Sequence, residues 1–488
     1  MLGDITVADE IYVICGYTDM RKSIDGLCAV VKDQLNMNPS RPNAIYLFCG
    51  RRSDRIKVLL HEREGFVLLY KRLDANVGKY RWPRNRNEVK PITWRQFDWL
   101  MSGLEIEQPK LERIDYYATT YECPQCKETE DPRFIKDEGT PALIPGSYAS
   151  SGLAAHVMYY KYVMSMPLYR QEKDFEHLGV KISRTTMASW IIYCAENYFL
   201  PMYEYLHRKL LKRRYLMADE TPIQVLKEEG RRPQSKSYVW LVRTGDNGGI
   251  PIILYNYTPT RAGSHAAAFL AGADPGYYLM VDGYKGYNKV PEAQRCCCWA
   301  HIRRYWLRAI PKGHEKDYTH PAVQGFLYCN KLFEYERSYR EKGLSPKQIY
   351  HRRLKDQKPV IEAFLSWLDQ LHPESGDRLI KAINYSNGCR PFMMNYLKDG
   401  ACSLSNNLSE NSIRPLVVGR KNWLFCDTPA GADASMKIYS MIETAKANEL
   451  DPLKYLSFLL EHRPGAEMSD EELEQFAPWS KLAQETCK

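Results

Sequence analysis

The sequence lacks an apolar run of the roughly 18 residues that a membrane-spanning helix needs. Its start, MLGDITVADE, is acidic and has no basic flank followed by a hydrophobic stretch, so no signal peptide is expected. It also lacks a P-loop, a glycine-rich dinucleotide fingerprint, an HExxH motif and a nucleophile elbow, so nothing points to ATP, NAD or serine-hydrolase chemistry. Internal repeats are absent as well. We expect a cytoplasmic protein with no membrane partner.

The composition is that of an ordinary soluble globular protein, with 44% hydrophobic and 26% charged residues, which excludes intrinsic disorder, collagen and low-complexity filaments. A length of 488 residues suggests about three domains. Fourteen cysteines without a secretory signal are typical of reduced thiols, and Cys296, Cys297 and Cys298 cannot all be bridged locally. The net charge of +9 suggests a polyanionic partner such as DNA, although a well-solvated surface explains the same excess.

The first segment, up to about Lys110, alternates strand-like stretches with short polar turns. A basic strip with interleaved aromatics follows the last strand, and in it Arg81, Arg84 and Arg86 could contact phosphates while the rings stack on bases. Alternatively, the strip is a surface loop whose Trp82 fills the small core. The pattern of the whole segment predicts strands over 11–14, 44–48, 55–60 and 65–70 and a helix over 23–35.

One CxxC pair, Cys123 and Cys126, could offer two thiolates to a zinc ion. A tetrahedral site needs four ligands, and no second CxxC or HxxxH lies within reach on either side. The pair therefore indicates half a zinc site, and we do not expect it to be loaded.

Residues 151–215 have a helical pattern, with helices predicted over 167–178 and 183–198. A short turn containing Gly179 joins them, and Ser183 is a suitable N-cap. This arrangement resembles a helix-turn-helix, which would place Arg184 and Thr185 at the start of a recognition helix for DNA. A helical hairpin that packs on the next domain explains the pattern equally well.

From Tyr215 the pattern changes to strands, and their order is that of a ribonuclease-H-like fold. The sequence predicts strands over 215–226, 237–242 and 251–257, a helix over 264–270 and a strand over 277–281. A helical stretch from 299 to about 397, a helix over 405–414, a strand over 422–425 and helices over 432–462 complete the chain. The expected class is a multidomain combination of α+β and α/β parts.

Two acids end or follow buried strands of this region, Asp219 and Asp282. If the two strands are neighbours in one sheet, the carboxylates face each other, and they repel unless cations bind between them. Hard oxygen ligands of this kind suit Mg²⁺, and two such ions polarise a phosphodiester. Glu220 is a rival ligand, but strand alternation sends it to the opposite face, so we prefer Asp219.

Glu410 is the best candidate for a third carboxylate. Asn406, Glu410 and Arg414 follow a spacing of four residues and would share one helix face. Such a face suits a metal ligand beside groups that hold phosphates. The alternative is a Glu–Arg surface pair that contributes only tenths of a kcal/mol.

Two further motifs are less specific. The first could place His301, Arg303 and Arg304 near a scissile phosphate, although a buried histidine bonded to a backbone carbonyl is the commoner outcome. The second carries Arg420 and Lys421 and could clamp DNA. Its Trp423 could stack on a splayed base, or simply fill the edge of the core.

Six motifs together resemble the transposase of the insertion-sequence-66 family, in the right order and over about 116–464. Ser405 and Asn411 stand where many relatives carry Asp and Arg. The motifs are Ala218-Asp-Glu-Thr-Pro222, Val281-Asp-Gly-Tyr284, Cys298-Trp-Ala-His301, Asn406-Asn-x-x-Glu410-x-x-x-Arg414-Pro415, Gly419-Arg-Lys-Asn-Trp-Leu-Phe425 and Ile442-Glu-Thr-Ala-Lys-Ala-Asn-Glu-Leu-Asp-Pro452.

This resemblance implies a DDE transposase, which nicks the ends of an insertion sequence and joins them to target DNA. It implies that Asp219, Asp282 and Glu410 hold two Mg²⁺ ions, for which Mn²⁺ can substitute. The implied partners are the terminal inverted repeats and target DNA, with a homo-oligomer on the paired ends and association with a bacterial nucleoid. We expect Arg414, Arg420 and Lys421 to contact phosphates.

The first segment resembles the small accessory protein of the same element. The likeness rests on the motifs Thr18-Asp-Met-Arg-Lys-x-Ile-Asp-Gly26, Gly50-Arg-Arg-x-Asp-Arg-Ile-Lys57 and Gly65-Phe-x-Leu-x-Tyr-Lys-Arg72. The chain therefore looks like a fusion to a transposase without its N-terminal coiled coil and first zinc-binding half. The expected parts are an accessory-protein-like α+β domain (1–108), a truncated zinc-binding-like segment (112–145), a helical helix-turn-helix-like region (146–214), a ribonuclease-H-like catalytic core (215–430) with a helical insertion at about 299–400, and a C-terminal helical segment (431–488).

The alternative to an enzyme is a protein that only binds DNA. A chain without that N-terminal segment could be a DNA-binding remnant that grips DNA through its basic surface but carries out no chemistry. The three acids argue for the enzyme, because a remnant has no need of them.

Overall fold

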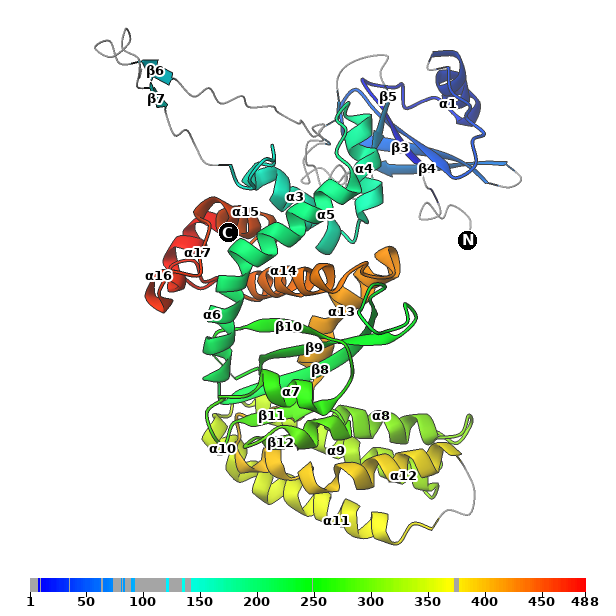
Figure 1. Ribbon diagram of the computed structural model, residues 1–488. Coiled ribbons are helices and arrows are strands. Elements are labelled where there is room, and N and C mark those ends of the chain that lie inside the picture. The colour runs from blue at the N-terminus through cyan, green and yellow to red at the C-terminus, as the bar shows by residue number, and fades with distance from the viewer. Residues whose placement is uncertain are drawn as a thin grey trace. The chain divides into compact units, whose positions relative to one another are not determined.

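The computed structural model describes residues 8, 10–34, 36–62, 65–72, 80, 82–83, 89–92, 120–122, 134–136, 142–247, 249–372 and 377–488. The chain divides into two compact units, 1–115 and 116–488, which we describe separately (Figure 1). Helices and mixed sheets occur together, so the predicted multidomain α/β class is confirmed. Within the described ranges, no helix has the length and apolar character needed to cross a membrane.

The first unit is built on a five-stranded sheet in the order β4-β3-β2-β1-β5. Only β1 and β2 are parallel, and the other neighbouring strands are antiparallel. Helix α1 continues as a π-helical turn, and its Leu27 packs on one face of the sheet. The bounds are β1 Glu10–Ile14, α1 Ile24–Ala29, the π-turn Val30–Gln34, β2 Ala44–Cys49, β3 Arg55–Glu62, β4 Gly65–Arg72 and β5 Val89–Ile92.

Trp82 belongs to the core on the other face of this sheet. Its side chain is buried, and its indole N–H donates to the carbonyl of Ile14 at 2.9 Å. The alternative in which Trp82 fills the small core is therefore the one the structure supports. Arg81, Arg84 and Arg86, the predicted phosphate contacts of this strip, lie outside the described residues.

The second unit opens with a two-stranded sheet, β6 (Thr120–Glu122) and β7 (Phe134–Lys136). The predicted half zinc site, Cys123 and Cys126, lies between these strands and outside the described residues. A helical layer follows, and it contains both predicted helices of the helix-turn-helix-like region. Its bounds are α3 Ser151–Tyr162, α4 Leu168–His177, α5 Arg184–Cys194, a π-turn Ala195–Phe199 and α6 Leu200–Leu211.

A second five-stranded sheet forms the centre of this unit, in the order β10-β9-β8-β11-β12. Strands β10, β9 and β8 are antiparallel neighbours, whereas β11 runs parallel to both β8 and β12. The short strand β12 was not predicted, because Gln-Arg-Cys-Cys has no alternating pattern. The bounds are β8 Tyr215–Gln224, β9 Lys236–Thr244, β10 Ile253–Thr258, α7 Gly263–Phe269, β11 Tyr278–Val281 and β12 Gln294–Cys297.

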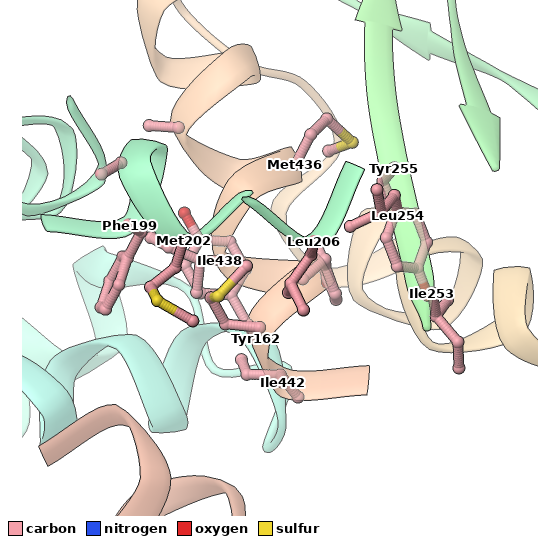
Figure 2. Close-up of a cluster of buried hydrophobic side chains, with 14 of the residues drawn as sticks. Tyr162, Phe199, Met202, Leu206, Ile253, Leu254, Tyr255, Met436, Ile438 and Ile442 are labelled. Atoms are coloured by element: carbon pink, nitrogen blue, oxygen red, sulfur yellow. The ribbon is translucent and has the colours of Figure 1, made fainter. Parts of the chain in front are cut away.

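Alternate residues of this sheet enter two different cores. Leu216 and Ala218 belong to the core shared with the helical layer and α14, whereas Met217 belongs to the core shared with the helices between 299 and 389. The first core is densely packed from elements far apart in the sequence. Figure 2 shows Tyr162 of α3, Phe199 of the π-turn before α6, Met202 and Leu206 of α6, Ile253, Leu254 and Tyr255 of β10, and Met436, Ile438 and Ile442 of α14.

The helical insertion and the C-terminal helices complete the unit. The insertion follows β12 directly and returns to the sheet before α13. The insertion comprises α8 Trp299–Ala309, α9 Pro321–Glu341, α10 Pro346–Arg352, a π-turn Arg353–Gln357, α11 Lys358–Asp369 and α12 Asp377–Cys389. The C-terminal helices are α13 Asn407–Trp423, α14 Pro429–Ala447, α15 Pro452–His462, α16 Asp470–Glu474 and α17 Lys481–Cys487.

Helix α13 differs from its prediction at both ends. It continues through Pro415 to Trp423, so the predicted end at Arg414 and the predicted strand over 422–425 are wrong. A proline inside a helix removes one hydrogen bond, the one to the carbonyl four residues earlier. That carbonyl belongs to Asn411, which is exposed, so water can satisfy it.

Candidate active site

Asp219 and Asp282 come from neighbouring parallel strands, as predicted. Met280 of β11 pairs with Met217 of β8, and the same register extended by two residues places Asp282 beside Asp219. Parallel strands bring the same ends of the chain to one edge of a sheet, so the two carboxylates meet there. The pKa of Asp219 responds to the charge of Asp282, which shows that the two groups are within electrostatic reach.

Asp219 has the most perturbed carboxyl group of the site. Burial and the neighbouring Glu220 carboxylate raise its pKa to about 8, with further contributions from Asp282 and Glu410. The backbone N–H of Glu220 donates to Asp219 Oδ1 at 2.9 Å and only partly offsets this rise. Strong perturbation by burial and like charge is typical of functional sites.

Asn406 anchors the helix that carries the third acid. It precedes α13, is fully buried, and donates from Nδ2 to the carbonyl of Ala218 at 3.0 Å, one residue before Asp219. Asn406 therefore does not belong to the polar face that was predicted for Asn406, Glu410 and Arg414. The buried amide points into the core, where it supplies the donor that the strand carbonyl of Ala218 needs. Arg414 is exposed and has no such contact in the described residues.

Glu410 lies in the first turn of α13 and is contacted by two side chains of α8, Arg304 and His301. The guanidinium of Arg304 donates from Nη2 to Oε1 at 3.4 Å and to Oε2 at 3.2 Å. Nε2 of His301 lies 3.4 Å from Oε1. Burial lowers the pKa of His301, and the Glu410 carboxylate opposes that shift. The simple alternative of an exposed Glu410–Arg414 pair does not occur.

Glu220 is buried in the same region and has its own partners. The hydroxyl of Tyr287 donates to its Oε2 at 2.6 Å, and Arg261 forms an ion pair with its Oε1. Burial raises its pKa, Asp282 adds to the rise, and Tyr287 and Arg261 oppose it. Glu220 therefore adds to the negative potential around Asp282, although alternation was expected to remove it to the other face.

The turn after β11 is held by residues that the sequence did not indicate. Asp282 Oδ1 accepts from the backbone N–H of Tyr284 at 2.8 Å. The backbone N–H of Gly283 donates to the hydroxyl of Tyr385 at 2.8 Å, and a Cβ at Gly283 would lie 2.6 Å from that ring. Arg295 of β12 donates to the carbonyl of Asp282 at 3.1 Å.

Arg303 and Trp423 do not have the surroundings predicted for DNA contacts. Arg303 donates from Nε to Asn330 at 3.1 Å, and its guanidinium lies 4.7 Å from the ring centre of Phe326 on α9. Its charge is therefore used in packing the insertion. Trp423 is half-buried against the core, with Nζ of Lys161 lying 5.3 Å from its ring, so the core-edge alternative is the correct one.

The other predicted contacts lie on or near the surface. Arg184 and Thr185 are exposed at the start of α5, whose N-cap is Ser183, with its Oγ accepting from Thr186. The backbone N–H of Arg184 already donates to a carboxylate, that of Glu172, at 3.1 Å. Arg420 is partly buried and donates to Thr221 at 3.3 Å, while Lys421 is exposed.

The carboxylates of Asp219, Asp282 and Glu410 are chemically suited to bind Mg²⁺, but they are not arranged as a complete coordination shell. Carboxylate oxygens are the ligands that Mg²⁺ prefers, and a cation would relieve the repulsion that raises the pKa of Asp219. Among the described residues, no group of three or more His, Cys, Asp or Glu side chains is close enough together to hold a metal ion. Glu410 is instead engaged by Arg304 and His301.

Comparison with known protein families matches three segments of the chain. Residues 146–434 match the Transposase IS66 family. The chain belongs to this family. Residues 440–479 match the IS66 C-terminal element, and residues 9–111 match the IS66 Orf2 like protein. The resemblance proposed from the motifs, including the fusion of two proteins of one element, is confirmed, and it supports a transposase role.

Three relatives come from Sinorhizobium fredii (strain NBRC 101917 / NGR234). The chain is 27% identical to the uncharacterized protein y4qI over 405 residues, which cover 78% of this chain and 73% of y4qI. It is 26% identical to the uncharacterized protein y4hP over 345 residues, which cover 66% of this chain and 61% of y4hP. It is 31% identical to the uncharacterized protein y4hO over 101 residues, which cover 21% of this chain and 85% of y4hO.

Proposed function

We propose that this IS66-family chain is a DDE transposase that cleaves the ends of an insertion sequence and transfers them to target DNA. One observation carries the proposal: Asp219 and Asp282 come from parallel neighbouring strands, and the charge of Glu410 on α13 acts on the same buried carboxyl group. A solvent-exposed set of structural ion pairs would not raise a carboxyl pKa in this way.

We propose a ribonuclease-H-like fold for the sheet and its helices. Three antiparallel strands β8–β10, a crossover through α7, and parallel strands β11 and β12 support it. In this arrangement the first strand lies in the middle of the sheet and carries Asp219, and Asp282 directly follows β11 beside it. The helical insertion then separates these two acids from Glu410 in the sequence.

The chemistry consists of two phosphoryl transfers at one site. In the first, the oxygen of water forms a bond to the scissile phosphorus, and the 3′-oxygen of the strand leaves and takes a proton. In the second, that 3′-hydroxyl gives up its proton and attacks a phosphorus of the target DNA, whose own 3′-oxygen leaves. Two Mg²⁺ ions held by Asp219, Asp282 and Glu410 would polarise the phosphodiester and activate the attacking oxygen.

The remaining residues would orient this site. Tyr385 and Arg295 hold the turn that carries Asp282, and Asn406 ties the start of α13 to β8. Arg304 has the reach to hold the Glu410 carboxylate and, once that carboxylate binds a cation, to pair with a phosphate oxygen instead. Arg414, Arg420 and Lys421 on α13 are the proposed phosphate contacts outside the reacting centre.

A strand-transfer assay tests this function. Labelled DNA from both flanks of the gene would be incubated with the full chain, a target plasmid and Mg²⁺ or Mn²⁺, beside the Asp282→Asn variant. We expect metal-dependent nicking and joining that the variant lacks, with unchanged DNA binding by gel shift. DNA binding without any product would identify a DNA-binding remnant, and equal activity in Asp282→Asn would overturn the assignment of the acids.

A further inference from the structure

Leu424 and Phe425 form an exposed apolar pair directly after α13. Their relative exposures are 63% and 43%, and they are the only two consecutive residues among the large exposed hydrophobic side chains of the described ranges. Leucine and phenylalanine are among the residues most often buried. Single exposed apolar residues need no explanation, but an adjacent pair held into solvent points to a contact.

The backbone forces this pair outward. Leu424 has φ 64° and ψ −52°, and the N–H of Phe425 donates to the carbonyl of Trp423 at 2.8 Å. These values define the γ-turn of positive φ, which is rare and strained for a leucine. Strained residues of this kind persist when their surroundings hold them, and they occur most often at functional sites.

Both sides of the turn are fixed to the protein. Trp423 packs against the core beside Lys161. Cys426 pairs with β8, donating to the carbonyl of Gln224 at 2.9 Å and accepting from Leu226 at 3.0 Å. The turn therefore presents its two apolar side chains from a rigid base rather than from a free loop.

A positively charged stripe of α13 leads to the same pair. Five exposed positions repeat along the helix at alternating intervals of four and three residues, so they lie on one face. Phe425 follows four residues after Lys421, beyond the γ-turn that ends the helix. The stripe has two cations and no acid, which complements the backbone of a nucleic acid. Its residues are Asn407, Asn411, Arg414, Val418 and Lys421.

The distance between the proposed acids and the apolar pair can be estimated along β8. Gln224, which holds the turn, is five residues along β8 from Asp219, or roughly 17 Å at the rise of a strand. The nucleotides of one DNA strand are about 3.4 Å apart along the helix axis. The apolar pair therefore lies about five nucleotides from a phosphate bound at the acids.

We propose that Leu424 and Phe425 are a wedge that inserts between two base pairs of bound DNA, about five nucleotides from the scissile phosphate. In this proposal, Arg414 and Lys421 contact phosphates that lie between the scissile phosphate and the two base pairs that the wedge separates. Apolar wedges of this type unstack one base step and kink the duplex, which brings more of its backbone against the protein. The wedge rests on the proposed function, because its position is counted from the proposed acids.

The test uses base unstacking as its readout. A 30-base-pair duplex with a 3′-hydroxyl end would carry one 2-aminopurine, moved in turn from the first to the tenth nucleotide. With saturating full-length chain and no divalent metal, we expect at least a 2-fold rise in fluorescence that peaks about four to six nucleotides from the end. Phe425→Ala should abolish the peak, and Phe425→Trp should retain it.

Two further variants separate the wedge from effects on folding. Leu424→Gly keeps the turn, because glycine adopts positive φ without strain, and it should reduce the peak. Leu482→Ala removes a comparably exposed leucine of α17 and should leave the peak unchanged. A rise spread evenly over all positions, or a peak that survives Phe425→Ala, would overturn the wedge.

The remaining outcomes distinguish the wedge from other failures. If the pair instead contacts a second copy of the chain, Phe425→Ala will change the sedimentation of the free protein and leave the fluorescence profile intact, which overturns the wedge. If the wedge is right and the transposase function is wrong, the peak will appear but no metal-dependent product will form in the strand-transfer assay.

Discussion

The guanidinium of Arg304 lies 3.2 Å from Oε2 of Glu410, the proposed third metal ligand. The two residues are 106 positions apart, and the pair joins the first helix of the insertion to α13. The guanidinium of Arg304 would therefore compete with a metal ion for this carboxylate, and a metal ion that displaced it would free the guanidinium for a phosphate.

This competition predicts the effect of Arg304→Gln on metal affinity. Partly exposed ion pairs contribute up to about 1 kcal/mol, and 1.4 kcal/mol corresponds to a tenfold change in affinity. We therefore expect the variant to bind Mn²⁺ up to about 5-fold more tightly in the absence of DNA, by isothermal titration calorimetry. Arg208→Gln, which removes a similar ion pair to Asp470, is the control. Unchanged or weaker binding in Arg304→Gln would show that Arg304 does not compete with metal.

The raised pKa of Asp219 predicts that the stability of the metal-free chain depends on pH. The folded carboxyl of Asp219 keeps a proton up to a pKa of about 8, whereas an unfolded aspartate loses it near 3.9. The folded state thus binds more protons between these values, and the free energy of unfolding should fall as pH rises from about 4 to about 8. In EDTA, the Tm advantage of Asp219→Asn over the original chain should grow across this window. A constant Tm difference would contradict the raised pKa.

Tyr385 is predicted to act as a positioning residue for Asp282. Tyr385→Phe keeps the ring, which stacks on Tyr305 at 4.1 Å, and removes the acceptor for the Gly283 N–H. An unsatisfied backbone group costs about 1–3 kcal/mol when buried, and part of that cost should appear as a loss of orientation at Asp282. We expect a lower kcat for strand transfer with an unchanged KM for DNA. Tyr305→Phe, which leaves the Gly283 bond in place, should be close to normal, and a change in KM alone would rule out the positioning role.

The sequence supports different parts of the site for different physical reasons. Asp219 and Asp282 could be proposed because each directly follows a short apolar run, and such a local pattern can be read from neighbouring residues. Tyr385 and Arg295 were not, since they reach the turn after β11 from α12 and β12, which only folding brings there. Glu410 was first proposed from its four-residue spacing with Asn406 and Arg414, a pattern that a surface ion pair shares, and the resemblance to a family then favoured it as the third acid.

The errors around α13 have a similar cause. Pro415 is a local signal for the end of a helix, but β8, β9 and α3 pack against this helix and stabilise it beyond the proline. Trp423 was predicted as a DNA contact because its motif carries Arg420 and Lys421, and filling the edge of the core was the alternative. Its burial depends on Lys161, which lies more than 250 residues earlier in the chain, and on core residues of other elements. These contacts cannot be read from the sequence around Trp423.

Removal of the buried side chain of Asn406 is expected to lower the stability of the protein. Asn406 is fully buried, donates to the carbonyl of Ala218, and its Oδ1 also contacts the hydroxyl of Ser409. Asn406→Ala leaves the buried carbonyl of Ala218 without its donor, whereas the Ser409 hydroxyl keeps the backbone carbonyl of residue 406 as an acceptor. At about 1–3 kcal/mol for one buried unsatisfied group, we expect a loss of that size in the free energy of unfolding. Urea unfolding at neutral pH measures this loss.

Asn406→Asp is the matched variant that identifies the donor. It preserves size and the acceptor for Ser409 but replaces the amide donor with a carboxylate oxygen that faces a carbonyl. We expect it to be at least as destabilising as Asn406→Ala, because a buried charge without a partner is worse than a cavity of the same size. Asn407→Ala, one residue later and exposed, should change the free energy of unfolding by less than about 0.5 kcal/mol. A stable Asn406→Asp variant would show that the bond to Ala218 does not hold α13 against β8.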